Sequence, residues 1–270
     1  MKLDDHTISL SFRNYTGYGN ALHMAFKKMK IEVFLRHCYS SPNASLPNRK
    51  RPPWFDKSKV LGNLKHTINP ELAKINIVYD EHFGPISDVG HLVLEKPSDV
   101  EIINEGNEAG SFLRTLEIVE SRGYDEDTII YFVEDDYLHR ENWCEVLIEA
   151  FTLPTNYVSL YDHLDKYIDA GYNDLVSKVF HSDSCHWRTV PSTCNTYAGK
   201  MGQLRQDMQI HKHFSAASPD GISMDHAKFV ELGRHGRRLI TPMPGYSTHC
   251  DLLHSPTIDW EFVQLKTTHP

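Results

Sequence analysis

Apolar positions along the chain fall into short runs that alternate with segments of helical spacing. The clearest run covers residues 128–133, which are nearly all apolar, as expected of a central strand covered on both faces. Similar patterns predict strands over residues 7–12, 31–36, 75–79, 100–103, 157–161 and 238–242. Apolar residues spaced by three and four predict helices over residues 19–29, 59–67, 109–122, 142–151, 195–213 and 225–233. Residues 179–194 favour a hairpin or loop, and the tail from residue 245 an ordered loop.

This alternation of strands and helices predicts an α/β fold, in which helices flank a mixed, mainly parallel, Rossmann-like sheet. No change of composition marks a linker, so we expect residues 1–270 to form a single domain. The chain is 40% hydrophobic and 24% charged, values that allow a core of ordinary size.

The charge balance and the cysteines exclude several classes of protein. A formal net charge of -8 argues against nucleic acid as a partner, because phosphate binding favours a basic surface. No apolar run approaches the ~20 residues of a membrane helix, and the N-terminus lacks a signal-like apolar stretch, so a soluble, cytoplasmic chain without an integral membrane segment is expected. The five cysteines include no CxxC pair, which favours free thiols over a zinc ribbon or a disulfide framework.

An acidic triplet, Glu134-Asp135-Asp136, directly follows the clearest predicted strand. Ligands of open α/β sheets bind beyond the carboxyl ends of the strands. Adjacent carboxylates repel one another there, and a divalent cation relieves that repulsion. Oxygen ligands suit Mg²⁺ or Mn²⁺, which also bind diphosphate. The alternative is a solvated turn or a helix N-cap, for which acidic residues are also common.

The run from Phe132 to Asp136 resembles the DxD region of glycosyltransferases with the GT-A fold, in the E-D-D version of the N-acetylglucosaminyltransferase I group. The resemblance implies a GT-A domain that uses Mn²⁺ or Mg²⁺ to move a sugar from a nucleotide-diphosphate sugar, such as a UDP-sugar, to a glycan acceptor hydroxyl. It implies that residues 1–140 bind the nucleotide sugar and residues 141–270 the acceptor. It also implies that Asp136 contacts the metal while Asp135 and Glu134 face the ribose and the sugar.

Further donor contacts are carried over from the same resemblance. The segment with Asn107 and Arg114 is similar to the region that lies against the donor in this family, and Asp80 matches the acid that commonly contacts the nucleobase. Residues 12–15 depart from the nucleotide-loop pattern of the family.

An inverting transfer needs a carboxylate that deprotonates the acceptor hydroxyl. Asp220 and Asp225 are candidates from the second half of the chain, and the resemblance assigns the role to Asp225 at the start of a late helix. The alternative for Asp225 is a helix N-cap. The resemblance also offers His249 as an added metal ligand, although a lone histidine is more often structural.

Three residues are candidates for acceptor binding: Trp187 and Tyr197, whose rings suit stacking on sugars, and Thr193, which lies where the family closes its site around the acceptor. The alternative for both aromatic residues is a place in the core.

Two other functions remain open: a metal-dependent hydrolase or phosphoesterase acting on a carbohydrate or phosphate ester, and a non-catalytic carbohydrate-binding module. The first would favour HxH or HxxxD groups at strand ends, and no such group follows a clear predicted strand. The second would have little use for the acidic triplet.

Overall fold

The computed structural model describes residues 29–40, 50–92, 99–216, 221–252 and 254–268. The predicted strand 7–12, nearly all of the predicted helix 19–29 and the alternative base Asp220 lie outside the described residues. Within the described part of the chain, every helix is too short or too polar to cross a membrane. All five cysteines are free thiols, as predicted.

A nine-stranded mixed sheet forms the centre of the molecule, with the strand order β3-β2-β1-β4-β9-β6-β10-β8-β7. The longest ladders are parallel and join β1 to β2 and to β4, whereas β9 runs antiparallel to both of its neighbours. The strands are β1 (Ile31–Cys38), β2 (Ala73–Asp80), β3 (Val100–Ile103), β4 (Ile129–Glu134), β6 (Tyr157–Val158), β7 (Val179–His181), β8 (His186–Thr189), β9 (Tyr197–Lys200) and β10 (Leu239–Met243). This architecture confirms the predicted α/β class.

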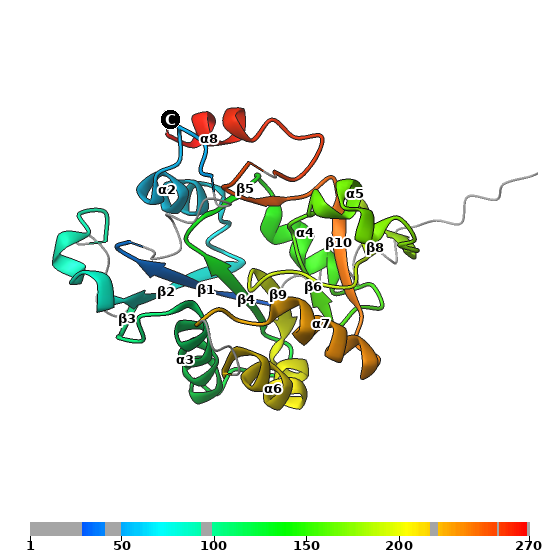
Figure 1. The fold of residues 1–270 in the computed structure, drawn as a ribbon, viewed down its shortest axis with the longest axis horizontal. Helices are drawn as coiled ribbons and strands as arrows, with labels where there is room; N and C mark the ends of the chain where they lie inside the picture. The colour runs from blue at the N-terminus through cyan, green and yellow to red at the C-terminus, as the bar shows by residue number, and fades with distance from the viewer. Residues whose placement is uncertain (1–28, 41–49, 93–98, 217–220, 253, 269–270) are drawn as a thin grey trace, which may run out of the picture.

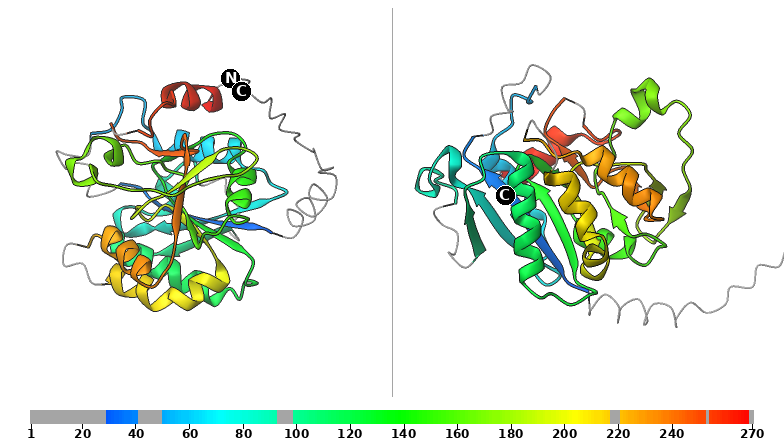
Figure 2. Two further views of the ribbon diagram at one scale, coloured as in Figure 1. Left: turned by 90° about the vertical axis from the view of Figure 1, so that its right-hand side faces the viewer. Right: turned by 60° about the horizontal axis from the view of Figure 1, so that its bottom comes forward.

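Helices cover both faces of the sheet, so the molecule has three layers (Figures 1 and 2). One face carries α3 (Glu108–Ser121), α6 (Met201–Ala216) and α7 (Asp225–Arg234), and the other carries α2 (Lys57–Thr67) and α4 (Trp143–Ala150). The C-terminal helix α8 (Trp260–Thr268) packs on α2. A short ribbon of β5 (Tyr137–His139) and β11 (Ser247–His249) lies outside the main sheet.

The two cores follow from the alternation of side chains along the central strands. In β1, Val33 and Leu35 join the core under α2 and α4, whereas Phe34 joins the core under α3, α6 and α7. In β4, Tyr131 and Val133 face the first core and Phe132 the second. Both faces are apolar because both are covered, which explains why these strands have continuous apolar runs.

The structure corrects three predicted elements and confirms the hairpin expected within residues 179–194, which β7 and β8 form. The predicted helix 195–213 begins with strand β9, and its helical part starts only at Met201. The predicted strand 157–161 shortens to Tyr157–Val158. The tail from residue 245, expected to be loop, contains β11 and α8.

Tertiary contacts, rather than local pattern, select the strand at β9. It inserts between β4 and β6 and pairs with both, which satisfies its backbone groups on two sides. Gly199 permits this approach, because a Cβ there would lie 2.8 Å from Cε1 of Tyr157. Any larger residue at Gly199 would therefore displace the buried Tyr157 ring.

Candidate active site

The acidic triplet lies at the carboxyl end of β4, where the alternation of side chains separates its members. Glu134 lies beside Arg36 of the parallel strand β1, and both side chains point to the sheet face that α3 covers. Asp135, one residue later, contacts His37 of β1 and Lys57 of α2 on the opposite face. The three carboxylates therefore have three different sets of partners.

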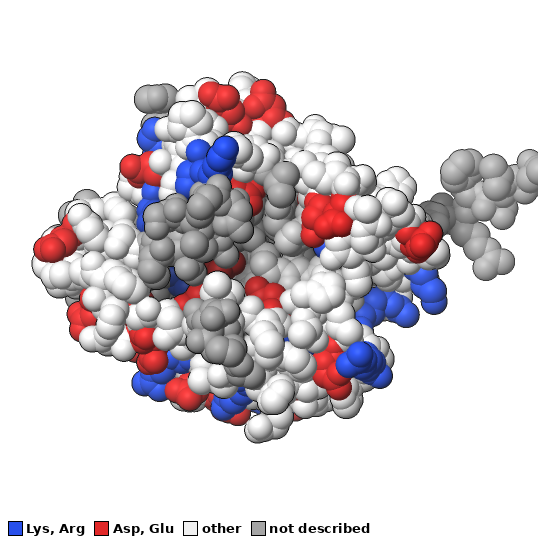
Figure 3. All heavy atoms as spheres, in the orientation of Figure 1, with Lys and Arg blue, Asp and Glu red and all other residues white. Residues whose placement is uncertain are grey.

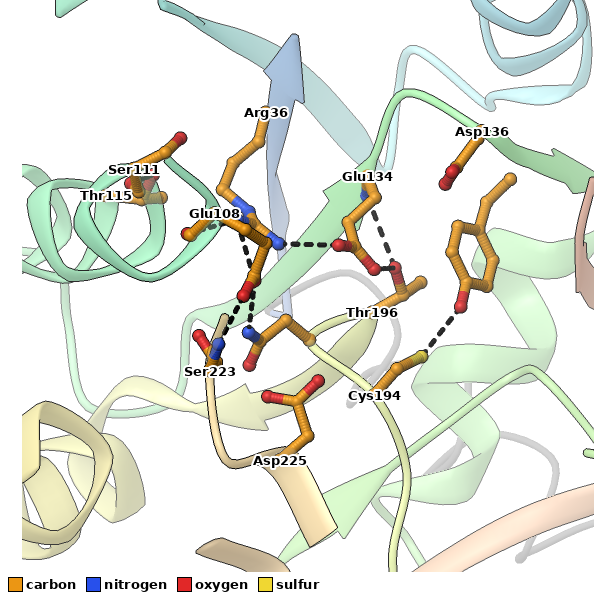
Figure 4. A network of polar contacts seen from close by, with 12 residues as sticks. Arg36, Glu108, Ser111, Thr115, Glu134, Asp136, Cys194, Thr196, Ser223 and Asp225 are labelled. Carbon is orange, nitrogen blue, oxygen red and sulfur yellow. Dashed lines mark hydrogen bonds and ion pairs between the residues drawn. The ribbon is translucent and has the colours of Figure 1, made fainter. Parts of the chain in front are cut away.

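Glu134 belongs to a network centred on a buried arginine (Figure 4). The Arg36 guanidinium donates to Glu134 Oε1 at 2.9 Å and to Glu108 Oε1 at 3.2 Å, and it lies 5.0 Å from the centroid of the Phe112 ring. Burial raises the pKa of Glu134 to about 7, even though Arg36 favours its charged form. Burial also disfavours charge on Glu108, but Arg36 and the Ser223 amide outweigh it and hold that pKa below its usual value.

The Asp135 carboxylate contacts groups of β1 and α2. Its Oδ2 lies 2.5 Å from His37 Nδ1, 2.7 Å from Lys57 Nζ and 3.1 Å from the Cys38 amide nitrogen. Although burial opposes its charge, Lys57 and His37 lower the pKa of Asp135 to about 2. Asp135 is therefore an ionised anchor between β1, α2 and β4.

Asp136 meets His249 where β5 pairs with β11. The Asp136 Oδ2 lies 3.0 Å from His249 Nε2 and 2.6 Å from Arg51 Nη2, and His249 Nδ1 lies 2.7 Å from Asp251 Oδ2. Burial disfavours the charged imidazole, but Asp136 and Asp251 raise the pKa of His249 to about 10. Burial likewise opposes charge on Asp136, yet His249 and Arg51 hold its pKa well below the usual range.

Asp136 and His249 offer an oxygen and a nitrogen ligand that suit a hard or borderline divalent cation. Asp136 Oδ1 is buried without a hydrogen-bond partner among the described residues. The Asp251 carboxylate orients the His249 ring, as a supporting carboxylate does for metal-bound histidines. Among the described residues, no group of three or more His, Cys, Asp or Glu side chains could hold a metal ion. A cation here would thus need oxygens from a bound diphosphate or water, and it would compete with Arg51 for Asp136.

A cavity of about 210 Å³ joins these groups to the second half of the chain. In the space-filling view, acidic side chains lie inside a hollow in the middle of one face (Figure 3). The residues that line the cavity are Glu108, Glu134, Tyr137, Tyr161, His163, Asp165, Cys194, Ile222, Asp225, His249 and Asp251. The structure therefore brings three sequence-predicted residues, Glu134, Asp225 and His249, to one cavity.

Asp225 lies across the network from Glu134 (Figure 4). It is the first residue of α7, and the residue at the N-cap is Met224, so the structure does not support the N-cap alternative for Asp225. The side chain is 24% exposed, and its Oδ1 lies 3.5 Å from Lys228 Nζ. Burial raises the pKa of Asp225 to about 6, although Lys228 favours the charged form.

The three remaining donor candidates do not line this cavity. The Asp80 carboxylate accepts hydrogen bonds from the amides of His82, Glu105 and Gly106, and so shapes the turn that follows β3. Asn107 caps α3 by accepting from the Gly110 amide at 2.8 Å.

Arg114 is 49% exposed and pairs with Glu117 on the surface of α3 at 2.8 Å. It lies six residues beyond the cavity-lining Glu108 on the same helix. The structure thus places Arg114 on an exposed helix face rather than in the cavity.

Two of the three acceptor candidates need correction. Trp187 and Tyr197 are fully buried, the first in the core under α4 and the second in the core under α6 and α7, so neither presents a ring to a sugar. Thr193 is buried but close to the cavity, since its hydroxyl donates to Ser159 at 2.8 Å and contacts His163 at 3.2 Å.

The sequence analysis missed several charged residues of the site, among them Arg36, Arg51, Lys57 and Glu108. A signal for Arg36 existed, because it is the last residue of the predicted strand 31–36, and in the structure it lies opposite Glu134 in the parallel pairing of β1 with β4. The rule that identified the acidic triplet, applied to β1, would have identified Arg36 and His37 as well.

Comparisons with known proteins add little to this geometry. No family model matches the chain, and no curated protein matches it. Among solved structures, it is similar to 4-diphosphocytidyl-2C-methyl-D-erythritol synthase from Anaerococcus prevotii, with 9% identity, a TM-score of 0.46 and coverage of 91% of this chain and 99% of that one. It is also similar to CMP:2-keto-3-deoxy-manno-octonic acid synthetase complexed with CTP, with 11% identity, a TM-score of 0.48 and coverage of 89% and 100%. The functional assignment therefore rests on the site itself.

Proposed function

We propose that the chain is a glycosyltransferase that moves a sugar from a nucleotide-diphosphate sugar to an acceptor hydroxyl, with inversion and with help from a divalent cation. One observation carries the proposal. A single cavity at the carboxyl end of β4 is lined by Glu134 and His249 from one side and by Asp225, a carboxylate whose pKa is about 6, from α7. His249 in turn contacts Asp136, so a donor and an acceptor could lie between Asp136 and Asp225.

Asp225 is suited to act as the base in this reaction. Its pKa of about 6 keeps it ionised at neutral pH, yet near enough to the working pH to accept a proton efficiently. About a quarter of its side chain is exposed, and Asp225 lines the cavity, so an acceptor hydroxyl can reach the carboxylate there. The proton of the hydroxyl would pass to the Asp225 carboxylate as the oxygen attacks the anomeric carbon and the diphosphate leaves.

Asp136 and His249 are the residues that would hold a divalent cation. When bound, Mn²⁺ or Mg²⁺ would neutralise charge that develops on the departing diphosphate. Asp251 would orient His249, and Arg51 would add positive charge beside Asp136. Glu134, fixed by Arg36 and by the Thr196 hydroxyl 3.4 Å from its Oε2, would accept a hydrogen bond from the donor.

The alternative of a metal-dependent hydrolase or phosphoesterase has less support. Such enzymes hold their metal with several protein ligands, and among the described residues no group of three or more His, Cys, Asp or Glu side chains could hold a metal ion. Nothing in the geometry of the cavity favours that second function.

The test is a transfer assay with a panel of nucleotide sugars, Mn²⁺ and glycan acceptors, analysed by NMR of the anomeric proton. An α-linked donor should give a β-linked product, and the product should depend on the acceptor. Asp225→Asn should form little of the product. Arg114→Ala, on the exposed face of α3, is the matched control and should form as much product as the unmodified chain. Sugar or phosphate release that is independent of the acceptor would instead support the hydrolase.

A further inference from the structure

Lys228 is a fully buried lysine directly beneath the proposed base. It lies one turn after Asp225 on α7, and no part of its side chain is exposed. Its ammonium lies 4.5, 5.1 and 5.6 Å from the ring centroids of Phe112, Tyr197 and Phe229. These three rings form an aromatic cage, in which cation–π attraction offsets part of the desolvation of the charge.

The polar partners of the ammonium are Asn195 Oδ1, through a short hydrogen bond, and Asp225 Oδ1 at 3.5 Å. Burying a charge costs free energy even when the charge has a partner. An apolar side chain of the same length would fill the aromatic cage without that cost. Stability alone therefore gives no reason for a lysine here, and its contact with the cavity-lining Asp225 indicates a role in the site.

Asn195 connects this lysine to the opposite wall of the cavity. It is fully buried, and its Nδ2 donates to Glu108 Oε1 at 2.8 Å while its Oδ1 accepts from Lys228. Because both ends of the amide have partners, Asn195 fixes the position of the ammonium. The lysine cannot swing away from Asp225 without breaking a buried hydrogen bond.

The charged groups around Asp225 include few cations that could pair with its carboxylate. The groups that face Asp225 are Arg36 from β1, Glu108 from α3, Glu134 from β4, Cys194 from the segment before β9, Tyr197 from the start of β9, and Lys228 from its own helix. Arg36 already forms ion pairs with both Glu108 and Glu134. Lys228 is therefore the cation, among these groups, that is left for Asp225.

We propose that Lys228 is a positioning residue, whose caged ammonium holds the Asp225 carboxylate ionised and directed into the cavity. The proposal rests on the assigned role of Asp225 as the base. Removal of the ammonium should leave Asp225 beside two carboxylates without a cation of its own, so that it protonates more readily and fails as a base at neutral pH.

The test follows Asp225 directly, in protein with ¹³C-labelled aspartate carboxyl carbons, where the Asp225 signal is identified by its loss in Asp225→Asn. In Lys228→Met, whose unbranched side chain fits the cage, Asp225 should titrate at least about one pH unit higher than in the unmodified chain. The acid limb of kcat/KM should move by the same amount, and activity should recover at higher pH. Lys212→Met, which removes a partly exposed lysine of α6 that pairs with Glu120 of α3, is the matched control and should change neither.

A reciprocal measurement does not depend on the folding of Lys228→Met. In Asp225→Asn, the ¹³Cε signal of Lys228 should titrate at lower pH than in the unmodified chain, because the ammonium loses its carboxylate partner. An unchanged titration of Lys228 in Asp225→Asn, or of Asp225 in Lys228→Met, would overturn the proposal. A shifted Asp225 titration with an unchanged acid limb of kcat/KM would refute the base assignment and leave the pairing of Lys228 with Asp225 standing.

Discussion

Asp225→Asn should separate catalysis from stability, because it removes a carboxylate that the fold does not need. As the base, Asp225 accounts for a rate factor of ~10²–10⁴ in kcat, and donor binding should stay near normal because Asp225 lies on α7 rather than in the Asp136–His249 pair. The asparagine keeps the size of the side chain and can still accept a hydrogen bond from Lys228.

The stability of the variant follows from the sign of the pKa change. Burial raises the pKa of Asp225 from its usual 3.8 to about 6, so the native state disfavours the ionised form. Stability associated with this group is therefore present at low pH and is lost as the pH rises from about 4 to about 6. At about 1.4 kcal/mol per pKa unit, the neutral asparagine gains at most about 3 kcal/mol at pH 7. The weakened contact with Lys228 acts in the opposite direction and reduces this gain.

The assay combines steady-state kinetics with thermal unfolding at pH 4 and pH 7. The free energy of unfolding of Asp225→Asn, relative to that of the unmodified chain, should be unchanged or higher at pH 7, and the difference should shrink toward pH 4. A normal kcat would refute the base assignment. A variant that melts well below the unmodified chain at pH 7 would refute the argument that the ionised carboxylate is unfavourable in the fold.

Four further outcomes follow from the same geometry. The kcat/KM of the unmodified chain should rise with pH through about 6, because Asp225 must be ionised to accept a proton, and a pH–rate profile checks this. Arg36→Met should lower the free energy of unfolding by about 3–5 kcal/mol in chemical denaturation, because it leaves Glu108 and Glu134 without their buried cation. Arg114→Ala should change stability by less than about 0.5 kcal/mol and leave the KM for the donor unchanged, since the side chain is exposed and pairs with Glu117 on the same helix. Transfer should stop in a chelator and return with Mn²⁺, whereas full turnover in the chelator would transfer the role of the cation to Arg51.

The central part of the fold was predictable from the sequence because its strands are buried on both faces. The apolar runs of β1, β2 and β4 need no tertiary information to be recognised as strands. Strand β9 was not predictable, because four residues adjoining a helix carry too little pattern and its pairing with β4 and β6 decides its conformation. Helix α8 was missed because its pattern is weakly amphipathic, and its burial depends on packing against α2.

The candidate site was predictable only where its charged residues are adjacent in the sequence. The acidic triplet is such a case, whereas Arg36, Glu108 and Asp225 are far apart and meet only through the register of β1 with β4 and the placement of α3 and α7. The wrong assignments of Trp187 and Tyr197 have the same origin, because sequence alone does not distinguish an aromatic residue in the core from one that lines a cavity.

Thermal melting with UDP and Mn²⁺ tests directly whether a nucleotide diphosphate binds beside Asp136 with the help of a cation. At a UDP concentration of 100 times Kd, the stabilisation should be about 2.7 kcal/mol, which is several degrees of Tm for a chain of this length. The two ligands together should raise Tm by more than the sum of their separate effects. The Asp136→Ala variant should still unfold cooperatively but should lose this joint increase. A UDP-induced increase that is equal with and without Mn²⁺, or that persists in Asp136→Ala, would contradict the account.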